Sequence, residues 1–401
     1  MTAATHRSFK VNVPTSKSLS NRWLILNYLS NDSLNLHNLS SADDTMLLQT
    51  LLKHLNEDCE NTFYCKNAGT VARFLTAVLC IQEGKEYIIT GDKRMQQRPI
   101  EPLVDALRQI GADISYLNTE GHFPLKIKGK TLIGNTLSIS ADISSQFVSA
   151  LMLIAPFLPQ GLTIEIQGAI ASRSYILMTQ KVLQQAGIKV RWSDNKIHIH
   201  NSTIKPQTVT IEKDWSSVSY LYNWILFLAQ KEYELHIEGL FKDSCQGDKV
   251  VAELYETLGV TTSYTSTGIT LKTTERRTNT FVYNFKDCPD LVPTLAVACA
   301  GLGISGTLLG LDTLPYKETN RIEALASELK KMNINVSYNS KSLHIEAGKI
   351  KITQAISTYN DHRMAMAFAT LQAFDNNITI ENHEAVNKSF PEYWQEISNL
   401  K

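Results

Sequence analysis

The sequence has no excess of charge of either sign, because 39 lysines and arginines balance 39 aspartates and glutamates in 401 residues. This balance excludes a broad basic face for nucleic acid or anionic lipid, so any cationic site must be local. We therefore expect small-molecule partners, with no nucleic acid and no membrane. The neutral charge and the lack of a clear apolar surface patch also favour a monomer.

Long apolar runs and paired cysteine motifs are missing as well. The longest apolar stretches, such as Val148 to Leu158, are interrupted by proline, and the N-terminus has no apolar core typical of a signal peptide. We therefore expect a cytoplasmic protein. The six cysteines include no C-x-x-C pair and no histidines at zinc spacing, which predicts reduced thiols without disulfides or bound metal.

An internal repeat organises the chain. An amphipathic helix, a small or polar stop and an alternating strand that ends in an aromatic residue recur four times. The stops are Gly111, Gly187, Gly259 and Asn333, which lie 72 to 76 residues apart. Glycine and asparagine suit the left-handed residue that closes a helix, so these positions predict helix ends.

Six further segments predict helices that are apolar on nearly all sides, and such helices are buried. They start near Ser18, Thr70, Ser145, Ser216, Asp290 and Asp361. Aliphatic strands follow, for example at 162–168, 233–239 and 377–383. The pattern indicates six copies of a unit with two helices and about four strands, an α/β fold whose first two copies are compressed. Six copies divide into two similar domains, which we expect at residues 16–211 and, discontinuously, at residues 1–15 plus 212–401.

The residues that open the six buried helices are rich in groups that hold anions. Free N–H groups and a partial positive charge make helix N-termini anion sites. Taken singly, these serines and aspartates are explained better as ordinary N-caps. Their recurrence favours anion binding, and so do Lys17, Arg22 and Arg363, because a cation beside a helix N-terminus is unfavourable unless something negative lies between them.

Three other segments place isolated charge in apolar surroundings. Arg98 precedes a proline at the entry of a helix, and Lys388 lies in a loop before a proline. Lys317, Glu318 and Arg321 fall together in a third segment. This last group also fits a solvated helix start with weak local ion pairs.

Seven motifs follow one another along the chain: P-T-S-K-S-L-S-N-R, K-N-A-G-T, Q-Q-R-P-I, S-S-Q-F, Q-G-D, K-E-T-N-R and Y-N-D-H-R-M-A-M. In this order they resemble the EPSP synthase (3-phosphoshikimate 1-carboxyvinyltransferase) family over the whole chain. The resemblance implies two domains of three βαβαββ repeats each, in the inside-out α/β barrel of the enolpyruvyl transferases. It also implies transfer of the enolpyruvyl group of phosphoenolpyruvate to the 5-hydroxyl of shikimate 3-phosphate, with release of phosphate and no cofactor.

The resemblance further implies roles for individual residues. Shikimate 3-phosphate would be held by Lys17, Ser18, Arg22, Ser144, Ser145, Gln146, Ser172, Asp290 and Lys317. Phosphoenolpyruvate would be held by Lys17, Gly69, Arg98, Gln146, Arg321, Arg363 and Lys388. Asp290 would accept a proton and Glu318 would protonate the methylene carbon, with Lys17 and Lys388 completing the catalytic set. The departures from the family pattern include Thr313, which replaces an asparagine that often contacts shikimate 3-phosphate, and Phe74, which is larger than usual.

Two other functions remain open. A transferase acting on UDP-N-acetylglucosamine shares the fold, but it usually carries S-K-N and a reactive loop cysteine. This chain has Ser16-Lys17-Ser18 and no cysteine at 91–102. A non-catalytic sensor of phosphate ligands needs only the binding residues, whereas the residues expected to perform catalysis are all present.

Overall fold

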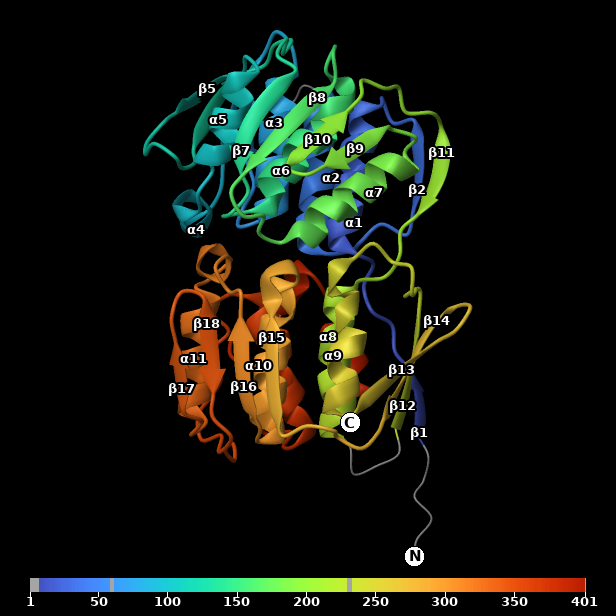
Figure 1. The fold of residues 1–401 in the computed structure, drawn as a ribbon, viewed down its shortest axis with the longest axis vertical. Helices are drawn as coiled ribbons and strands as arrows, with labels where there is room; N and C mark the ends of the chain where they lie inside the picture. Colours follow the sequence, from blue (N-terminus) through green and yellow to red (C-terminus); the bar gives the residue numbers. More distant parts are fainter. Residues whose placement is uncertain (1–6, 58–60, 229–232, 401) are drawn as a thin grey trace, which may run out of the picture. The chain divides into compact units, whose positions relative to one another are not determined.

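The computed structural model describes residues 7–57, 61–228 and 233–400. The chain divides into two compact units. The C-terminal unit comprises Met1–Ser16, Ser41–Asp43 and Glu212–Lys401, and the N-terminal unit comprises Lys17–Ser40 and Asp44–Ile211. In Figure 1 the N-terminal unit is drawn in blue to green, and most of the C-terminal unit in yellow to red.

A βαβαββ repeat with a single strand order occurs four times in the described residues. The first two strands pair in parallel, and the fourth lies between the second and third, antiparallel to both. In the N-terminal unit one repeat contains β3 (Thr62–Tyr64), α3 (Gly69–Cys80), β4 (Glu86–Thr90), α4 (Lys93–Gln97), α5 (Glu101–Gln109), β5 (Asp113–Tyr116) and β6 (Leu125–Lys128). The next contains β7 (Thr136–Ser140), α6 (Ser145–Ile154), β8 (Leu162–Gln167), α7 (Arg173–Gln185), β9 (Val190–Ser193) and β10 (Lys196–Ile199).

The C-terminal unit contains the other two full repeats. One is built from β1 (Arg7–Lys10), α8 (Trp215–Phe227), β12 (Tyr233–Glu238), α9 (Val251–Leu258), β13 (Val260–Tyr264) and β14 (Gly268–Thr273). The other is built from β15 (Thr280–Asn284), α10 (Val292–Leu302), β16 (Ser305–Leu309), α11 (Arg321–Lys331), β17 (Val336–Tyr338) and β18 (Ser342–Ile345). The predicted α/β fold is thereby confirmed.

The first and last repeats are incomplete. The first has α1 (Lys17–Leu29), β2 (Leu34–His37), α2 (Asp43–Glu57) and β11 (Gln207–Thr210), which pairs in parallel with β2. The last has α12 (His362–Ala369) and α13 (Tyr393–Ser398). The prediction of a strand at 377–383 in this repeat is wrong. In that segment Ile380 alone is paired, through a single bridge to Ile356. Compression predicted for the second copy is also wrong, since that repeat has all its strands.

The strand β1 pairs in the unit that holds the other end of the chain, whereas β11 stays in the N-terminal unit beside β2. β1 stands at the start of the chain but pairs with β12 in the C-terminal unit. The chain therefore leaves the C-terminal unit after β1 and returns to it after β11, and the short segment Ser41–Asp43 also belongs to that unit. In the C-terminal unit the two crossing segments run antiparallel: Ser16 N donates to Glu212 O at 3.0 Å, and Asp214 N donates to Pro14 O at 2.9 Å.

Three buried helices pack together in each unit, α1, α3 and α6 in one and α8, α10 and α12 in the other. Every residue of α8 and α12 is buried, as their apolar patterns predicted. In Figure 1 the sheets lie around these helices. The four predicted stops, Gly111, Gly187, Gly259 and Asn333, all have positive φ and follow α5, α7, α9 and α11, which confirms those helix ends.

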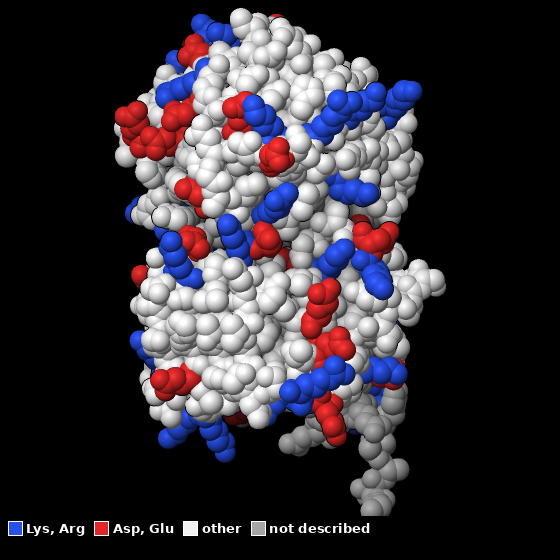
Figure 2. Space-filling view, in the orientation of Figure 1, with Lys and Arg blue, Asp and Glu red and all other residues white. Residues whose placement is uncertain are grey.

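The surface shows no segregation of charge on the face drawn in Figure 2, where basic and acidic side chains are interspersed. None of the helices in the described part of the chain combines the length and apolarity that a bilayer crossing requires. The cysteines at positions 65, 80, 288 and 299 are free thiols. Cys59 lies outside the described residues.

Candidate active site

The three core helices of the C-terminal unit meet at their N-terminal ends. Ser219 Oγ of α8 lies 3.0 Å from Thr294 Oγ1 of α10, within hydrogen-bond distance. Arg363 Nη1 of α12 donates to Tyr220 OH of α8 at 3.4 Å. All four residues belong to the first two turns of their helices, so three positive helix ends lie at one end of this unit.

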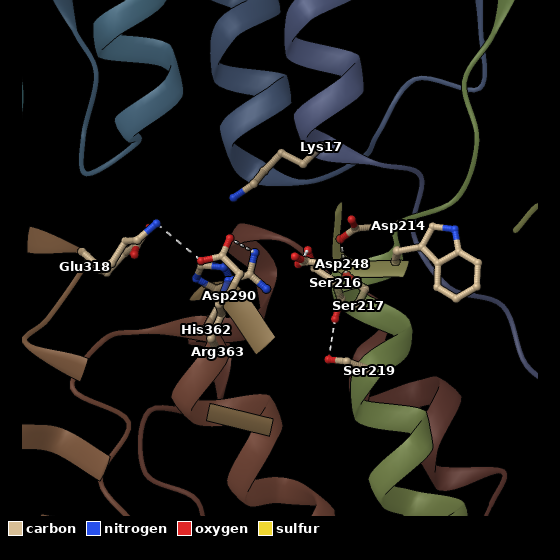
Figure 3. A network of polar contacts seen from close by, with 12 residues as sticks. Lys17, Asp214, Ser216, Ser217, Ser219, Asp248, Asp290, Glu318, His362 and Arg363 are labelled. Atoms are coloured by element: carbon tan, nitrogen blue, oxygen red, sulfur yellow. Dashed lines mark hydrogen bonds and ion pairs between the residues drawn. The ribbon is translucent and has the colours of Figure 1, made fainter. Parts of the chain in front are cut away.

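Asp290 lies in the 3-10 turn (Pro289–Leu291) that precedes α10, and three cations surround its carboxylate. It accepts from Arg363 Nη2 at 2.7 Å (Figure 3). It also accepts from Arg321 Nη1 at 2.9 Å, and Lys317 Nζ lies 3.6 Å away. Burial opposes ionisation of this carboxyl, but the three cations prevail and hold its pKa well below the usual range. Asp290 is therefore a weak base in this arrangement.

Arg321 connects three carboxylates from its position as the first residue of α11. Beyond Asp290, it donates from Nη2 to Glu318 Oε2 and from Nε to Asp361 Oδ2, both at 2.8 Å. Its side chain is 1% exposed. Burial acts against its charge, yet the carboxylates raise the pKa of Arg321 above its ordinary value. The alternative of a solvated helix start is therefore wrong, because this cation is buried among its partners.

Lys388 contacts the same cluster from another element. Its Nζ lies 3.3 Å from Glu318 Oε1. Lys388 ends the 3-10 helix His383–Lys388, so its predicted position in a loop is wrong. The Glu318 carboxylate thus has a cation on each oxygen, Arg321 on one and Lys388 on the other.

Asp248 of the Q-G-D motif is a second buried carboxyl near Asp290. Its Oδ2 accepts from Ser216 Oγ at 2.5 Å, while its Oδ1 has no hydrogen-bond partner among the described residues. Figure 3 shows Ser216 and Asp248 beside the start of α8. Burial and the negative charge of Asp290 raise the pKa of Asp248 to about 7. Two neighbouring carboxyls with opposite pKa shifts are a frequent property of functional sites.

The N-terminal unit also brings three helix starts to one end. Asn21 Nδ2 of α1 donates to Thr70 Oγ1 of α3 at 3.0 Å, and Arg22 Nη2 of α1 donates to Ser149 Oγ of α6 at 3.3 Å. Beside them, Lys17 Nζ lies 2.8 Å from Asp44 Oδ2, in a pair that is largely buried.

Arg22 is held inside the framework of this unit. It donates from Nε to Thr179 Oγ1 and from Nη1 to Ser18 O, both at 2.7 Å. Its Cζ lies 5.5 Å from the centre of the Phe74 ring. A guanidinium over an aromatic ring is stabilised by a cation–π interaction. The unusual Phe74 therefore has a structural function.

Two guanidinium groups converge on the start of α3. A Cβ on Gly69 would lie 2.7 Å from both Arg73 Nη1 and Arg98 Nη2, so a larger residue here would displace these guanidinium groups. Arg98 is 4% exposed, and its Nη1 donates to Asn67 Oδ1 at 3.2 Å. Two buried cations at a helix N-terminus form an arrangement suited to an anion.

The starts of α6 and α7 hold the remaining predicted residues. Ser144 Oγ caps α6 by accepting from Gln146 N at 3.3 Å, and Ser145 is the first residue of that helix. In the described ranges, Gln146 Oε1 is buried without a hydrogen-bond partner. Ser172 precedes α7 with a positive φ of 55°. Thr313 Oγ1, in the C-terminal unit, is likewise buried and without a partner among the described residues.

The predicted site residues are thus divided between the units. The C-terminal unit gathers Asp290, Lys317, Glu318, Arg321, Arg363 and Lys388 in one cluster. The N-terminal unit places the other nine at the beginnings of its helices or beside them. Across 7–57, 61–228 and 233–400, no three His, Cys, Asp or Glu side chains form a group that could hold a metal ion.

Asp44, Arg73 and Asp248 of these clusters had no predicted role, and Asp361 was expected only as an N-cap. Asp361 pairs with Arg321 and also caps α12, accepting from Arg363 N at 2.8 Å. Its place in the N-D-H-R motif was the one available signal. Asp44 gave none, because an acidic residue in the first turn of a helix is ordinary.

A family model for EPSP synthase (3-phosphoshikimate 1-carboxyvinyltransferase) matches residues 2–397. The chain is 41% identical over 391 residues to the 3-phosphoshikimate 1-carboxyvinyltransferase of Bacteroides fragilis, covering 96% of this chain and 94% of the relative. It is 34% identical over 413 residues to the enzyme of that name from Colwellia psychrerythraea, covering 97% of this chain and 96% of the relative.

Solved structures show the same fold. The EPSP synthase of Acinetobacter baumannii superposes with a TM-score of 0.74 at 20% identity, covering 99% of this chain and 96% of that one. The enolpyruvyl transferase NikO of Streptomyces tendae superposes with a TM-score of 0.70 at 14% identity and the same coverage. With the fold, the full-length family match and relatives of this identity in agreement, the chain belongs to the EPSP synthase (3-phosphoshikimate 1-carboxyvinyltransferase) family.

Proposed function

We propose that this chain transfers the enolpyruvyl group of phosphoenolpyruvate to the 5-hydroxyl of shikimate 3-phosphate and releases phosphate. This is a step of the shikimate pathway toward chorismate and the aromatic amino acids. The observation that carries the proposal is the concentration of buried cations at helix N-termini in each unit. Such groups suit two small substrates that both carry several negative charges.

Each substrate has its own proposed set of ligands. Shikimate 3-phosphate contacts Lys17, Ser18, Arg22, Ser144, Ser145, Gln146, Ser172, Asp290 and Lys317. Phosphoenolpyruvate contacts Lys17, Gly69, Arg98, Gln146, Arg321, Arg363 and Lys388. We also propose that the two units are the two domains expected at 16–211 and at 1–15 plus 212–401, and that the protein acts as a cytoplasmic monomer.

The reaction is an addition followed by an elimination. Glu318 gives a proton to the methylene carbon of phosphoenolpyruvate, while Asp290 accepts the proton of the attacking 5-hydroxyl, and a tetrahedral intermediate forms. Loss of phosphate and of one methyl proton then gives the product. Lys17 and Lys388 stabilise the negative charge of the phosphate group.

The low pKa of Asp290 fits this cycle if the substrates change its surroundings. Arg321, Arg363 and Lys317 hold the carboxylate as a weak base. Anions that bind these cations offset part of their charge, so the pKa of Asp290 rises and the carboxylate becomes a better base. Substrate binding would in this way prepare the proton acceptor.

Phosphate release from purified protein mixed with both substrates tests the proposal. Turnover with shikimate 3-phosphate, and none with UDP-N-acetylglucosamine, is the expected result. Binding of shikimate 3-phosphate without any phosphate release would instead favour the non-catalytic sensor.

Glu318→Gln tests the acid. The amide cannot give a proton to carbon, so kcat should fall by about 10²- to 10⁴-fold. Glu256→Gln is the matched control, because Glu256 is 53% exposed in a surface pair with Arg277 and should leave turnover unchanged. Wild-type turnover by the Glu318 variant would exclude the assigned role.

A further inference from the structure

The segment that leads into α12 makes a tight turn of an unfavourable type. Asp361 N donates to Thr358 O at 2.9 Å across it, and the two central residues, Tyr359 and Asn360, have φ of 53° and 55°. Two successive left-handed residues are typical of a type I′ turn, which favours Asn-Gly. A tyrosine in this region is strained, so neighbouring contacts must hold the turn.

Glu328 of α11 supplies such contacts. Its side chain is fully buried, and Oε1 accepts from Tyr359 OH at 2.6 Å while Oε2 accepts from Ser357 N at 3.2 Å. Lys331 Nζ also donates to Oε1, at 2.7 Å. Hydrogen bonds to a buried charge are strong. Glu328 therefore fixes both the approach to the turn and its first central residue.

The same helix, α11, also contacts the far end of the turn. Arg321 stands two helical turns before Glu328 on α11, and its guanidinium donates to Asp361. Asp361 in turn accepts from the backbone N–H of Arg363. Any movement of Tyr359 would be passed to Asp361, and from there to Arg321 and Arg363.

We propose that Glu328 is a positioning residue for phosphoenolpyruvate. Through Tyr359 it keeps the turn left-handed, and so keeps Arg321 and Arg363 in the places where they would bind the anion. Glu328 itself touches no substrate. The inference rests on the proposed function, because it takes these two arginines as phosphoenolpyruvate ligands.

Tyr359→Phe removes the hydroxyl and keeps the ring. The KM for phosphoenolpyruvate should rise about tenfold, the order expected for loss of a hydrogen bond to a charged group. Glu328→Gln should act in the same direction with a larger effect. Tyr338→Phe, on β17 beside α11, is the matched control, since Tyr338 is 44% exposed, and its KM should equal that of the wild type.

A hydroxyl that serves stability alone would lower Tm and the fraction of active protein but leave KM unchanged. That result for Tyr359→Phe would overturn the proposal. Hydrogen exchange of the Asp361 and Arg363 amides adds a measurement that needs no turnover. Both amides should exchange faster in Tyr359→Phe than in Tyr338→Phe, and equal rates would also overturn it. Absence of phosphate release by the wild type would count against the proposed function instead.

Discussion

Arg321 shows how one buried side chain can organise several acidic ones. Its guanidinium reaches Asp290, Glu318 and Asp361, each at 2.8 to 2.9 Å. A lysine has the same charge but a single nitrogen, and it cannot serve three carboxylates in a fixed geometry. The cluster therefore depends on the guanidinium fork as well as on the charge.

Arg321→Lys should lower kcat/KM by at least about a hundredfold and the free energy of unfolding by about 3 kcal/mol, because buried carboxylates lose partners. Steady-state kinetics and urea unfolding measure the two effects. Arg277→Lys is the control: Arg277 is 63% exposed, and its surface pair should contribute below about 1 kcal/mol. Equal behaviour of the two variants would show that Arg321 acts only through its charge.

Asp248 gives a stability prediction that depends on pH. Its pKa of about 7 lies above the value of about 3.9 for an unfolded chain. Asp248 therefore contributes stability that is fully present below about pH 4 and is lost as the pH rises through 7. Asp248→Asn cannot ionise, so relative to the wild type it should gain about 2 to 4 kcal/mol between pH 4 and pH 8.

Urea unfolding at the two pH values measures this gain, and Asp243→Asn, at an exposed position on the same segment, should show none. A difference between Asp248→Asn and wild type that does not vary with pH would mean that Asp248 has an ordinary pKa.

Helix ends provide a prediction at the scale of one element. Gly187 and Asn333 both close amphipathic helices with positive φ, at 84° and 63°. A Cβ on Gly187 would meet no atom within 4 Å, so a substitution there tests backbone conformation alone. Gly187→Ala should cost about 1 kcal/mol, whereas Gly187→Asn should cost less, since asparagine tolerates the left-handed region. Equal costs in thermal unfolding would contradict this explanation of the repeat.

The elements differ in how far the sequence could predict them. Local composition predicts the buried helices and the helix ends, and the structure confirms the ends at Gly111, Gly187, Gly259 and Asn333. Residues 1–15 were expected to belong with 212–401, but β1 and β12 lie more than 200 positions apart, and no local pattern indicates that they pair. The strand expected at 377–383 failed for a related reason, because an aliphatic pattern does not show whether a partner strand is available.

Site residues divide in the same way. Residues in distinctive motifs, such as Lys317 and Arg321, could be proposed as site residues from the sequence. Asp44 and Glu328 could not be identified, because an acidic residue on a helix is normally solvated. Only the structure shows that these two carboxylates are buried and which residues they contact. Asp361 was seen as an N-cap, and the structure gives it a second function as the partner of Arg321.

For the whole molecule, the use of β1 by the C-terminal unit makes the two units unequal. The N-terminal unit draws all its described strands from the residues between Lys17 and Ile211, which only Ser41–Asp43 interrupt. The C-terminal unit needs β1 from the other end of the chain. Val11 and Val13, which follow β1, are buried in its core, and Phe9 stacks on Tyr233.

A fragment of residues 17–211 should therefore fold alone, whereas residues 212–401 should not. Loss of β1 uncovers the edge of β12 and removes two buried valines, each worth about 1.5 to 3 kcal/mol, from a stability of about 5 to 15 kcal/mol. Adding a peptide of residues 1–16 should restore cooperative unfolding of 212–401, measured by circular dichroism. The same peptide with Val13→Asp should fail, because a charge would then enter the core. Cooperative unfolding of 212–401 without the peptide would show that β1 is dispensable. Residues 212–401 would then form a domain without the N-terminal segment.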